Sequence, residues 1–303
     1  MKMNKKIGGI AALLLCTVIW GFAFIAQSVG MDAMGPFTFQ TIRAALAVCF
    51  LVTFSFLLDG RKTSVSQSVA QWRQPRLWKS GILCGIALFF ASSLQQMALV
   101  DTDAGKAGFL TAMYIVLVPV LGLFLGKELG KGAIFSVLMA VFGLYLLSFA
   151  GPSGIQRGDF LLIASAFAFA VQITLVDRLC PGLDSFRLNG IQSLTVSLLS
   201  LPWMLLAETP NPEAIAACWL PLLFAGVLSM GVAYSLQIVG QKHVPPTAAS
   251  LIMSLESAFA ALGGWWLLGE RMTGTELAGC GLMFAAVVIS QLPEKRNVAQ
   301  TSL

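Results

Sequence analysis

The sequence predicts an all-α polytopic membrane protein with ten transmembrane helices arranged as two inverted five-helix repeats. The 303-residue chain is 57% hydrophobic and only 11% charged, with a mean hydropathy of +0.83, whereas soluble domains carry about 25% charged residues. Its apolar residues fall into stretches of about 20, the length of one membrane crossing. Motifs of the first half also recur in the second. These values exclude a disordered chain and disfavour a soluble enzyme, whose interior could not hold so much apolar surface.

Charged residues and Pro/Gly-rich segments separate the apolar spans. We predict helices at residues 7–29, 37–58, 79–100, 105–126, 132–150, 159–177, 187–207, 219–240, 247–268 and 274–292. The first span follows three lysines, as a signal peptide would. Its apolar run is longer than that of a signal peptide and no small-x-small cleavage site follows it, so we retain it as a helix.

The distribution of Lys and Arg predicts that both termini are cytoplasmic. Of the 19 basic residues, 15 fall in the two termini and in alternate loops. The opposite loops hold only Lys106, Arg157 and Arg271, and Arg43 lies inside a span. Because cytoplasmic loops of membrane proteins are enriched in Lys and Arg, the side with 15 is the inner one. The net charge of +5 therefore reflects topology, and we expect no nucleic-acid partner.

An internal repeat relates the two halves of the chain. Ser93-Leu94-Gln95 recurs as Ser235-Leu236-Gln237, an offset of 142 residues. Further pairs at offsets of 142 and 149 are Glu128 and Glu270, Trp20 and Phe169, and Phe37 and Phe186. We therefore predict two five-helix halves, residues 1–150 and 151–303.

Five helices is an odd number, so the second half must enter the membrane from the opposite side. Such inverted repeats suit alternating access, because exchanging the conformations of the halves converts an inward-facing state into an outward-facing one. We therefore expect a substrate site near the membrane midplane, between the halves.

Several motifs, taken in order and spacing, resemble the drug/metabolite transporter superfamily, specifically its EamA-like family. They are Trp20-Gly21, Arg43, Ala98-Leu99 through Pro119, Lys127-Glu128-Leu129, and Ser254-Leu255-Glu256 through Gly269-Glu270-Arg271. The resemblance covers nearly the whole chain. One departure is Ser257, where many relatives have Pro, so we expect the helix at 247–268 to be less kinked here.

The resemblance implies transport of small solutes, often export of amino acids or related metabolites, across a bacterial inner membrane. In such proteins helices 1–4 and 6–9 surround the cavity. Helices 5 and 10 stand aside, where they could pack against a second copy of the chain. The partners implied are a small-molecule substrate, membrane lipids and a coupling proton or counter-substrate.

Glu256 is the main candidate for the mechanism because it is the only carboxylate deep inside a span. A charge at that depth costs about 2.5–3.5 kcal/mol on insertion scales. On a helical wheel it shares a face with Ala249, Met253 and Ala260, where a cavity can open. Glu256 could couple a proton or cation, bind a substrate amine, or be a structural, hydrogen-bonded acid. Its counterpart in the first half is Tyr114, also polar.

Other polar residues inside spans are candidates for substrate binding. Arg43 could bind a substrate carboxylate, although we favour a structural tie to neighbouring groups. Gln95 and Gln237 are repeat-related and should face the pseudo-two-fold axis, either lining the cavity or joining helices. Weaker candidates are Gln172, Gln27 and Gln96, and Trp20, Phe24, Tyr114 and Tyr234 could form cavity walls.

The sequence lacks the motifs of several other functions. It has no Walker A sequence, no metal-spaced His/Cys cluster and no Ser/His/Asp set. We therefore predict no cofactor, no metal and no enzymatic activity, and a secondary transporter that exports a small polar metabolite such as an amino acid or derivative. The alternatives are a multidrug, organic-cation or nucleoside carrier of the same fold, an intramembrane lipid-modifying enzyme, and a channel.

Overall fold

The computed structural model describes residues 2–60, 64–102, 104–148, 157–267 and 273–291. Most of residues 151–158, where the two predicted halves join, lies outside these ranges, as do Glu270 and Arg271. The helices are α1 (Lys2–Ala33), α2 (Pro36–Asp59), α3 (Val65–Trp72), α4 (Pro75–Ala98), α5 (Ala104–Ala112), α6 (Tyr114–Phe124), α7 (Lys131–Ser148), α8 (Arg157–Leu179), α9 (Ser185–Ala207), α10 (Pro212–Ala217), α11 (Trp219–Leu223), the π-helix η1 (Phe224–Ala233), α12 (Tyr234–Gln241), α13 (Pro246–Met253), α14 (Glu256–Leu267) and α15 (Gly274–Gln291).

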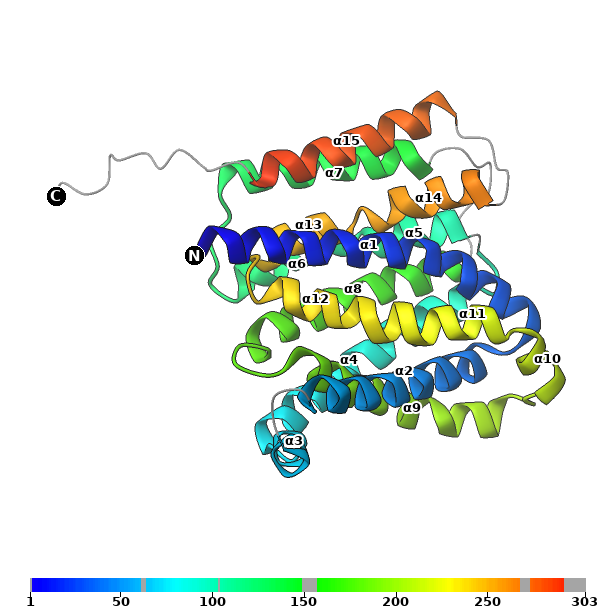
Figure 1. Cartoon of the computed structure of the whole chain (residues 1–303). Helices are drawn as coiled ribbons and strands as arrows, with labels where there is room; N and C mark the ends of the chain where they lie inside the picture. The colour runs from blue at the N-terminus through cyan, green and yellow to red at the C-terminus, as the bar shows by residue number, and fades with distance from the viewer. Residues whose placement is uncertain (1, 61–63, 103, 149–156, 268–272, 292–303) are drawn as a thin grey trace.

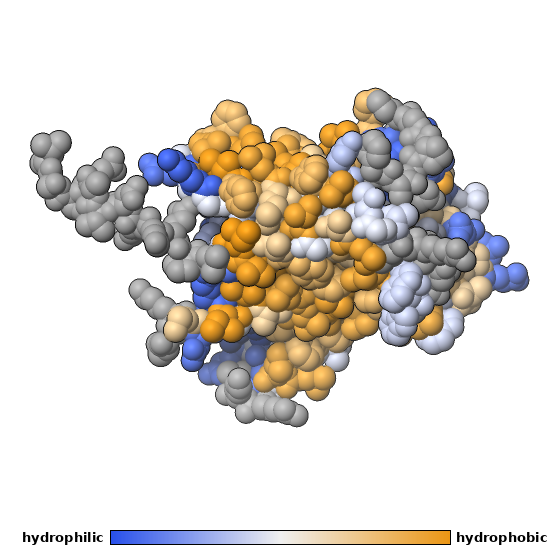
Figure 2. Space-filling model, turned by 90° about the horizontal axis from the view of Figure 1, so that it is seen from above, coloured by the Kyte–Doolittle hydropathy of each residue, from blue (hydrophilic) through white to orange (hydrophobic). Residues whose placement is uncertain are grey.

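The predicted class, an all-α polytopic membrane protein, is confirmed. Within the described ranges, nine helical stretches are long and apolar enough to cross a membrane, and α7 adds a shorter apolar helix at the place of the fifth predicted span. The count of ten crossings is therefore not confirmed by length alone. Large apolar side chains are exposed on many of these helices. They form the orange band in Figure 2, with hydrophilic residues toward its two ends, as a lipid-facing surface requires.

Several helices of the first half pack against helices of the second half. α2 packs on α9, its counterpart in the repeat, and α7 packs on α15. The contact of α4 with α8 in turn corresponds to that of α1 with η1 and α12. α7 and α15 lie along one edge of the bundle (Figure 1), which is the place that the family resemblance implies for helices 5 and 10. The start of α1 and the end of α15 lie on the same side.

Three predicted spans are not continuous α-helices. The span at 105–126 divides at Met113 into α5 and α6, and the span at 247–268 divides at Ser254 and Leu255 into α13 and α14. The helix at 247–268 is thus interrupted at its centre without proline, and the expectation that it is less kinked than in relatives stays a prediction. The Ser254 hydroxyl donates to the carbonyl of Leu251 at 2.8 Å, a back-bond that bends helices without proline. The third span, 219–240, contains the π-helix η1, which widens its central turns.

The short helix α3 was not among the predicted elements. Ser64 and Gln67 form a capping box at its start, so it folds as a helix of its own beside the ends of α2 and α9. The guanidinium of Arg187, at the start of α9, pairs with Asp59 at the end of α2. The same side chain donates to Ser68 on α3 at 3.2 Å. One buried cation thus joins the ends of three helices.

The opposite ends of α2 and α9 are joined by Glu208. Its carboxylate accepts from the backbone N–H groups of Phe37 and Thr38, at 2.8 and 2.7 Å, and from the Thr38 hydroxyl at 2.6 Å. It therefore caps the N-terminus of α2 from the end of α9, where the helix dipole favours negative charge. The approach requires Gly35, because a Cβ there would lie 2.2 Å from the Glu208 carboxyl carbon.

We predict that Glu208→Gln lowers the free energy of unfolding by about 1–2 kcal/mol, because an amide cannot accept from both backbone donors as the carboxylate does. The decrease is measurable as a lower Tm in detergent micelles. Glu213→Gln, which changes an exposed acid in the same loop region, is the control and should leave the Tm nearly unchanged. Equal effects of the two changes would contradict the capping role.

Candidate functional site

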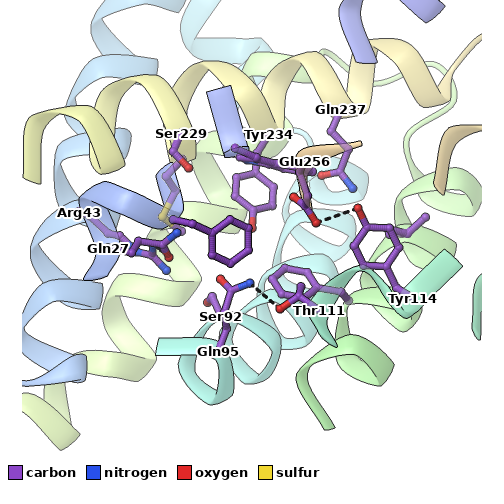
Figure 3. A pocket seen from close by; sticks show the side chains of 15 residues that line it. Gln27, Arg43, Ser92, Gln95, Thr111, Tyr114, Ser229, Tyr234, Gln237 and Glu256 are labelled. Atoms are coloured by element: carbon purple, nitrogen blue, oxygen red, sulfur yellow. Dashed lines mark hydrogen bonds between the residues drawn. The ribbon is translucent and has the colours of Figure 1, made fainter. Parts of the chain in front are cut away.

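A central cavity lies where the helices of the two halves meet. The free space among its side chains is small, about 30 Å³, which is room for about two water molecules. Its walls come from both halves, which is the position expected for the site of an inverted-repeat transporter. The residues that line it are Trp20, Phe24, Gln27, Arg43, Ser92, Gln95, Thr111, Tyr114, Phe169, Ile173, Ser229, Met230, Tyr234, Gln237 and Glu256 (Figure 3).

An acidic end of the cavity is formed by Glu256 and Tyr114. The Tyr114 hydroxyl donates to Glu256 Oε1 at 2.9 Å, and both side chains are buried. These two residues are counterparts in the predicted repeat, at an offset of 142 residues, and the structure brings them into direct contact. Each is also the first residue of the half-helix that follows a break, α6 for Tyr114 and α14 for Glu256. The breaks therefore place the polar groups of both halves at mid-span.

A basic end of the cavity is formed by Arg43 and two glutamines. The guanidinium donates to Gln40 Oε1 from Nε at 2.8 Å and to Gln27 Oε1 from Nη1 at 2.5 Å, and it lies 5.6 Å from the centre of the Phe39 ring. Among the described ion pairs, none joins Arg43 to a carboxylate. The predicted structural tie of Arg43 is thus present, and the residue also lines the cavity.

Amides, hydroxyls and aromatic rings lie between the two ends. Gln95 Nε2 donates to the Thr111 hydroxyl at 3.2 Å. The rings of Trp20 and Tyr234 lie 4.8 Å apart between centroids and form part of the wall. The cavity therefore offers hydrogen-bonding groups of both polarities beside apolar surface, which suits a small polar solute.

The structure gathers most of the predicted candidates at this one place. Glu256, Tyr114, Arg43, Gln95, Gln237 and Trp20 all line the cavity, as do the weaker candidates Gln27, Phe24 and Tyr234. Gln172 is not among the lining residues; its side chain is fully buried and bonds to Gln192 and Gln237. Gln96 does not line the cavity either. The roles of all these residues stay predictions.

Sequence reasoning missed the small and apolar members of the lining. Ser92, Thr111, Ser229, Phe169, Ile173 and Met230 carry no charge or amide that would mark them within an apolar span. Ser92 precedes the repeated Ser-Leu-Gln motif, which was its one available signal. Ser229 and Met230 lie on the π-helix η1, and hydropathy does not predict such a turn.

Comparison with known proteins identifies the family. Residues 7–149 and 156–291 each match the EamA-like transporter family. The chain belongs to this family. An uncharacterized transporter of Archaeoglobus fulgidus is 31% identical over 289 residues, which cover 95% of this chain and 87% of that protein. A solved crystal structure superposes with a TM-score of 0.77 at 18% identity, covering 95% of this chain and 96% of the other, and so supports the fold alone.

A further EamA-like relative carries a substrate in its name. The threonine/homoserine exporter RhtA of Salmonella typhimurium is 28% identical over 166 residues, which cover 53% of this chain and 55% of that protein. The family and the apolar helices together show that this chain is an integral membrane transporter.

The contact between Tyr114 and Glu256 is testable by a double-mutant cycle. We predict that Tyr114→Phe and Glu256→Gln are coupled by about 0.5–1.5 kcal/mol in thermal unfolding, because both changes act on the one hydrogen bond that joins the two side chains. Tyr234→Phe with Glu256→Gln is the comparison, since the structure shows no hydrogen bond between that pair, and these effects should add. A coupling no larger than that of the comparison pair would refute the contact.

Proposed function

We propose that this chain is a secondary transporter that exports a small amino acid or a close derivative by alternating access. The observation that carries the proposal is the cavity's two unlike ends, Glu256 with Tyr114 on one side and Arg43 with Gln27 on the other (Figure 3). A zwitterion has the matching polarity, with its ammonium at the carboxylate and its carboxylate at the guanidinium. The likeness to a threonine/homoserine exporter supports the same substrate class.

Burial explains why the site favours a ligand with both charges. Glu256 and Arg43 are each about 5% exposed, and isolated charges at this depth are costly. Their hydrogen-bond partners are a tyrosine hydroxyl and amide oxygens, which are neutral and offset only part of the cost. A bound zwitterion supplies an opposite charge to each end and lies among the amides between them.

We further propose that Glu256 couples transport to a proton or to a counter-substrate. It is the one carboxylate among the residues that line the cavity, and it sits where the two halves meet. A group that binds the proton in one state and the substrate in the other must be reached from both sides in turn. A position between the halves meets that requirement.

Other functions of the same fold fit the site less well. A carrier of organic cations has no use for Arg43, and a nucleoside carrier has no use for two opposed charges. A lipid-modifying enzyme needs paired carboxylates or histidines, whereas the lining of the described cavity holds a single carboxylate. A channel would not saturate. Pairing of two copies through α7 and α15 stays a prediction.

Counterflow in proteoliposomes tests the proposed function. Vesicles preloaded with pooled amino acids should accumulate labelled L-threonine or another member of the pool in a saturable manner, whereas vesicles preloaded with organic cations or nucleosides should not. We expect Glu256→Gln to abolish transport driven by a pH gradient while exchange is partly retained. Unchanged pH-driven rates in this variant would remove the coupling role. Accumulation only with the second pool would reject the amino-acid assignment.

We also propose that both termini are cytoplasmic, that the membrane is a bacterial inner membrane, and that residues 1–150 and 151–303 are the two repeats. The excess of Lys and Arg at the end of the bundle that holds the start of α1 supports the orientation. A single cysteine placed at exposed Gly105 (in a variant without exposed Cys49) should react in intact cells with a reagent that does not cross the membrane. Reaction only after lysis would place this loop in the cytoplasm and contradict the proposed topology.

A further inference from the structure

A chain of four buried amides lies behind the cavity. Gln237 Nε2 donates to Gln172 Oε1 at 3.1 Å, and Gln172 Nε2 donates to Gln192 Oε1 at 3.1 Å. Gln192 Nε2 then donates to Asn189 Oδ1 at 3.2 Å. None of the four side chains is more than 1% exposed, and among them only Gln237 lines the cavity. The amides come from α12, α8 and α9, so the chain crosses three helices.

The far end of this chain has only one workable orientation. Asn189 Nδ2 lies 2.9 Å from the carbonyl oxygen of Met230 and 2.9 Å from that of Gly231, both on η1. Carbonyl oxygens only accept hydrogen bonds, so the NH₂ group of Asn189 must face them. The reverse orientation would set its oxygen against two other oxygens in a buried site, at the cost of two unsatisfied acceptors.

The fixed orientation of the Asn189 amide determines the orientation of each amide in the network, up to Gln237 at the cavity. With its NH₂ held by η1, Asn189 presents oxygen to Gln192, which must therefore donate with its own NH₂. The same reasoning applies to Gln172 and then to Gln237, whose NH₂ is used on Gln172. Gln237 is left with its oxygen free, and among the described residues Gln237 Oε1 has no hydrogen-bond partner.

We infer that Gln237 is a specificity-determining residue whose carbonyl oxygen, fixed by the amide chain, accepts from the ammonium group of the substrate beside Glu256. Figure 3 shows the Gln237 amide next to the Glu256 carboxylate, so two acceptors share this end of the cavity. Such a pair favours a donor and rejects a carboxylate or carbonyl. Gln172, Gln192 and Asn189 are then positioning residues. The inference rests on the proposed function and orients its substrate, with the amine at Gln237 and the carboxylate toward Arg43.

The repeat counterpart of Gln237 shows that this polarity belongs to one end only. Gln95 also lines the cavity, but its NH₂ donates to the Thr111 hydroxyl at 3.2 Å. A hydroxyl both donates and accepts, so Gln95 can turn either its nitrogen or its oxygen to the substrate. The inverted repeat therefore provides one adaptable amide and one fixed amide.

Competition in counterflow tests the inference. Labelled L-threonine is the tracer, and the competitors are 1-amino-2-propanol, which keeps the amine without the carboxylate, and 3-hydroxybutyrate, which keeps the carboxylate without the amine. We expect the amine to compete at least about tenfold more strongly than the carboxylate in the wild type, the effect of one hydrogen bond to a charged group.

Variants behind the cavity separate positioning from general structure. Gln172→Leu breaks the chain and should raise the KM for threonine by about tenfold and reduce the ratio between competitors, with little change in kcat. Gln172→Glu should rescue both, because a neutral carboxylic acid accepts from Gln237 and donates to Gln192. Gln241→Leu is the matched control. It removes a buried amide one turn further along α12, which donates to the Ile173 carbonyl at 2.9 Å, and should keep the ratio.

The outcomes separate this inference from the proposed function. If the wild type transports amino acids but 3-hydroxybutyrate competes as well as the amine, the inference is wrong and the proposed function stands. Equal changes of the ratio in Gln172→Leu and Gln241→Leu would also overturn it. If only organic cations are transported, with the same dependence on Gln172, the amino-acid assignment fails and the polarity is supported. No accumulation by folded protein would reject both.

Discussion

Polar side chains inside the apolar layer are costly to bury unless they are hydrogen-bonded, and this constraint organises much of the structure. Water is absent from the lipid-facing region, so an unsatisfied group costs several kcal/mol. Some buried polar groups are satisfied by local hydrogen bonds, such as the Ser254 back-bond. Others share a longer network, such as the amides that run from Gln237 to Asn189. At the cavity these hydrogen-bond networks end, and hydrogen-bond donors and acceptors remain there for a ligand.

The breaks in the helices have the same origin. In a continuous α-helix through 247–268, the backbone groups would bond to one another, and the direction of the Glu256 side chain would be set by the helical periodicity alone. Serine hydroxyls that bond to the preceding turn bend the backbone just before Glu256, and the corresponding break at Met113 precedes Tyr114. Ser257 uses its hydroxyl in another way, donating to the Gly108 carbonyl on α5 at 2.8 Å. A hydroxyl thus ties the two divided helices together.

The sequence predicted the class of fold and the principal charged residues because these depend on strong, local signals. A carboxylate or guanidinium inside an apolar span is conspicuous, and Glu256 and Arg43 are both in the cavity. Gln172 looked equivalent to Gln237, since hydropathy cannot tell a side chain that faces the cavity from one a helix-width behind it. The π-helix η1 and the breaks at Met113 and Leu255 leave no signal in the hydrophobic periodicity.

The charged contacts at the two ends of α2 and α9 have a mechanical consequence. Glu208 holds one end of this antiparallel pair and Arg187 with Asp59 holds the other, so the helices are joined by charged contacts at both ends. Neither helix can slide or tilt against its counterpart without separating a buried charge from its partner. We therefore expect α2 and α9 to move together as one rigid pair. Rearrangement around the cavity is then expected in the interrupted helices, at the breaks between α5 and α6 and between α13 and α14.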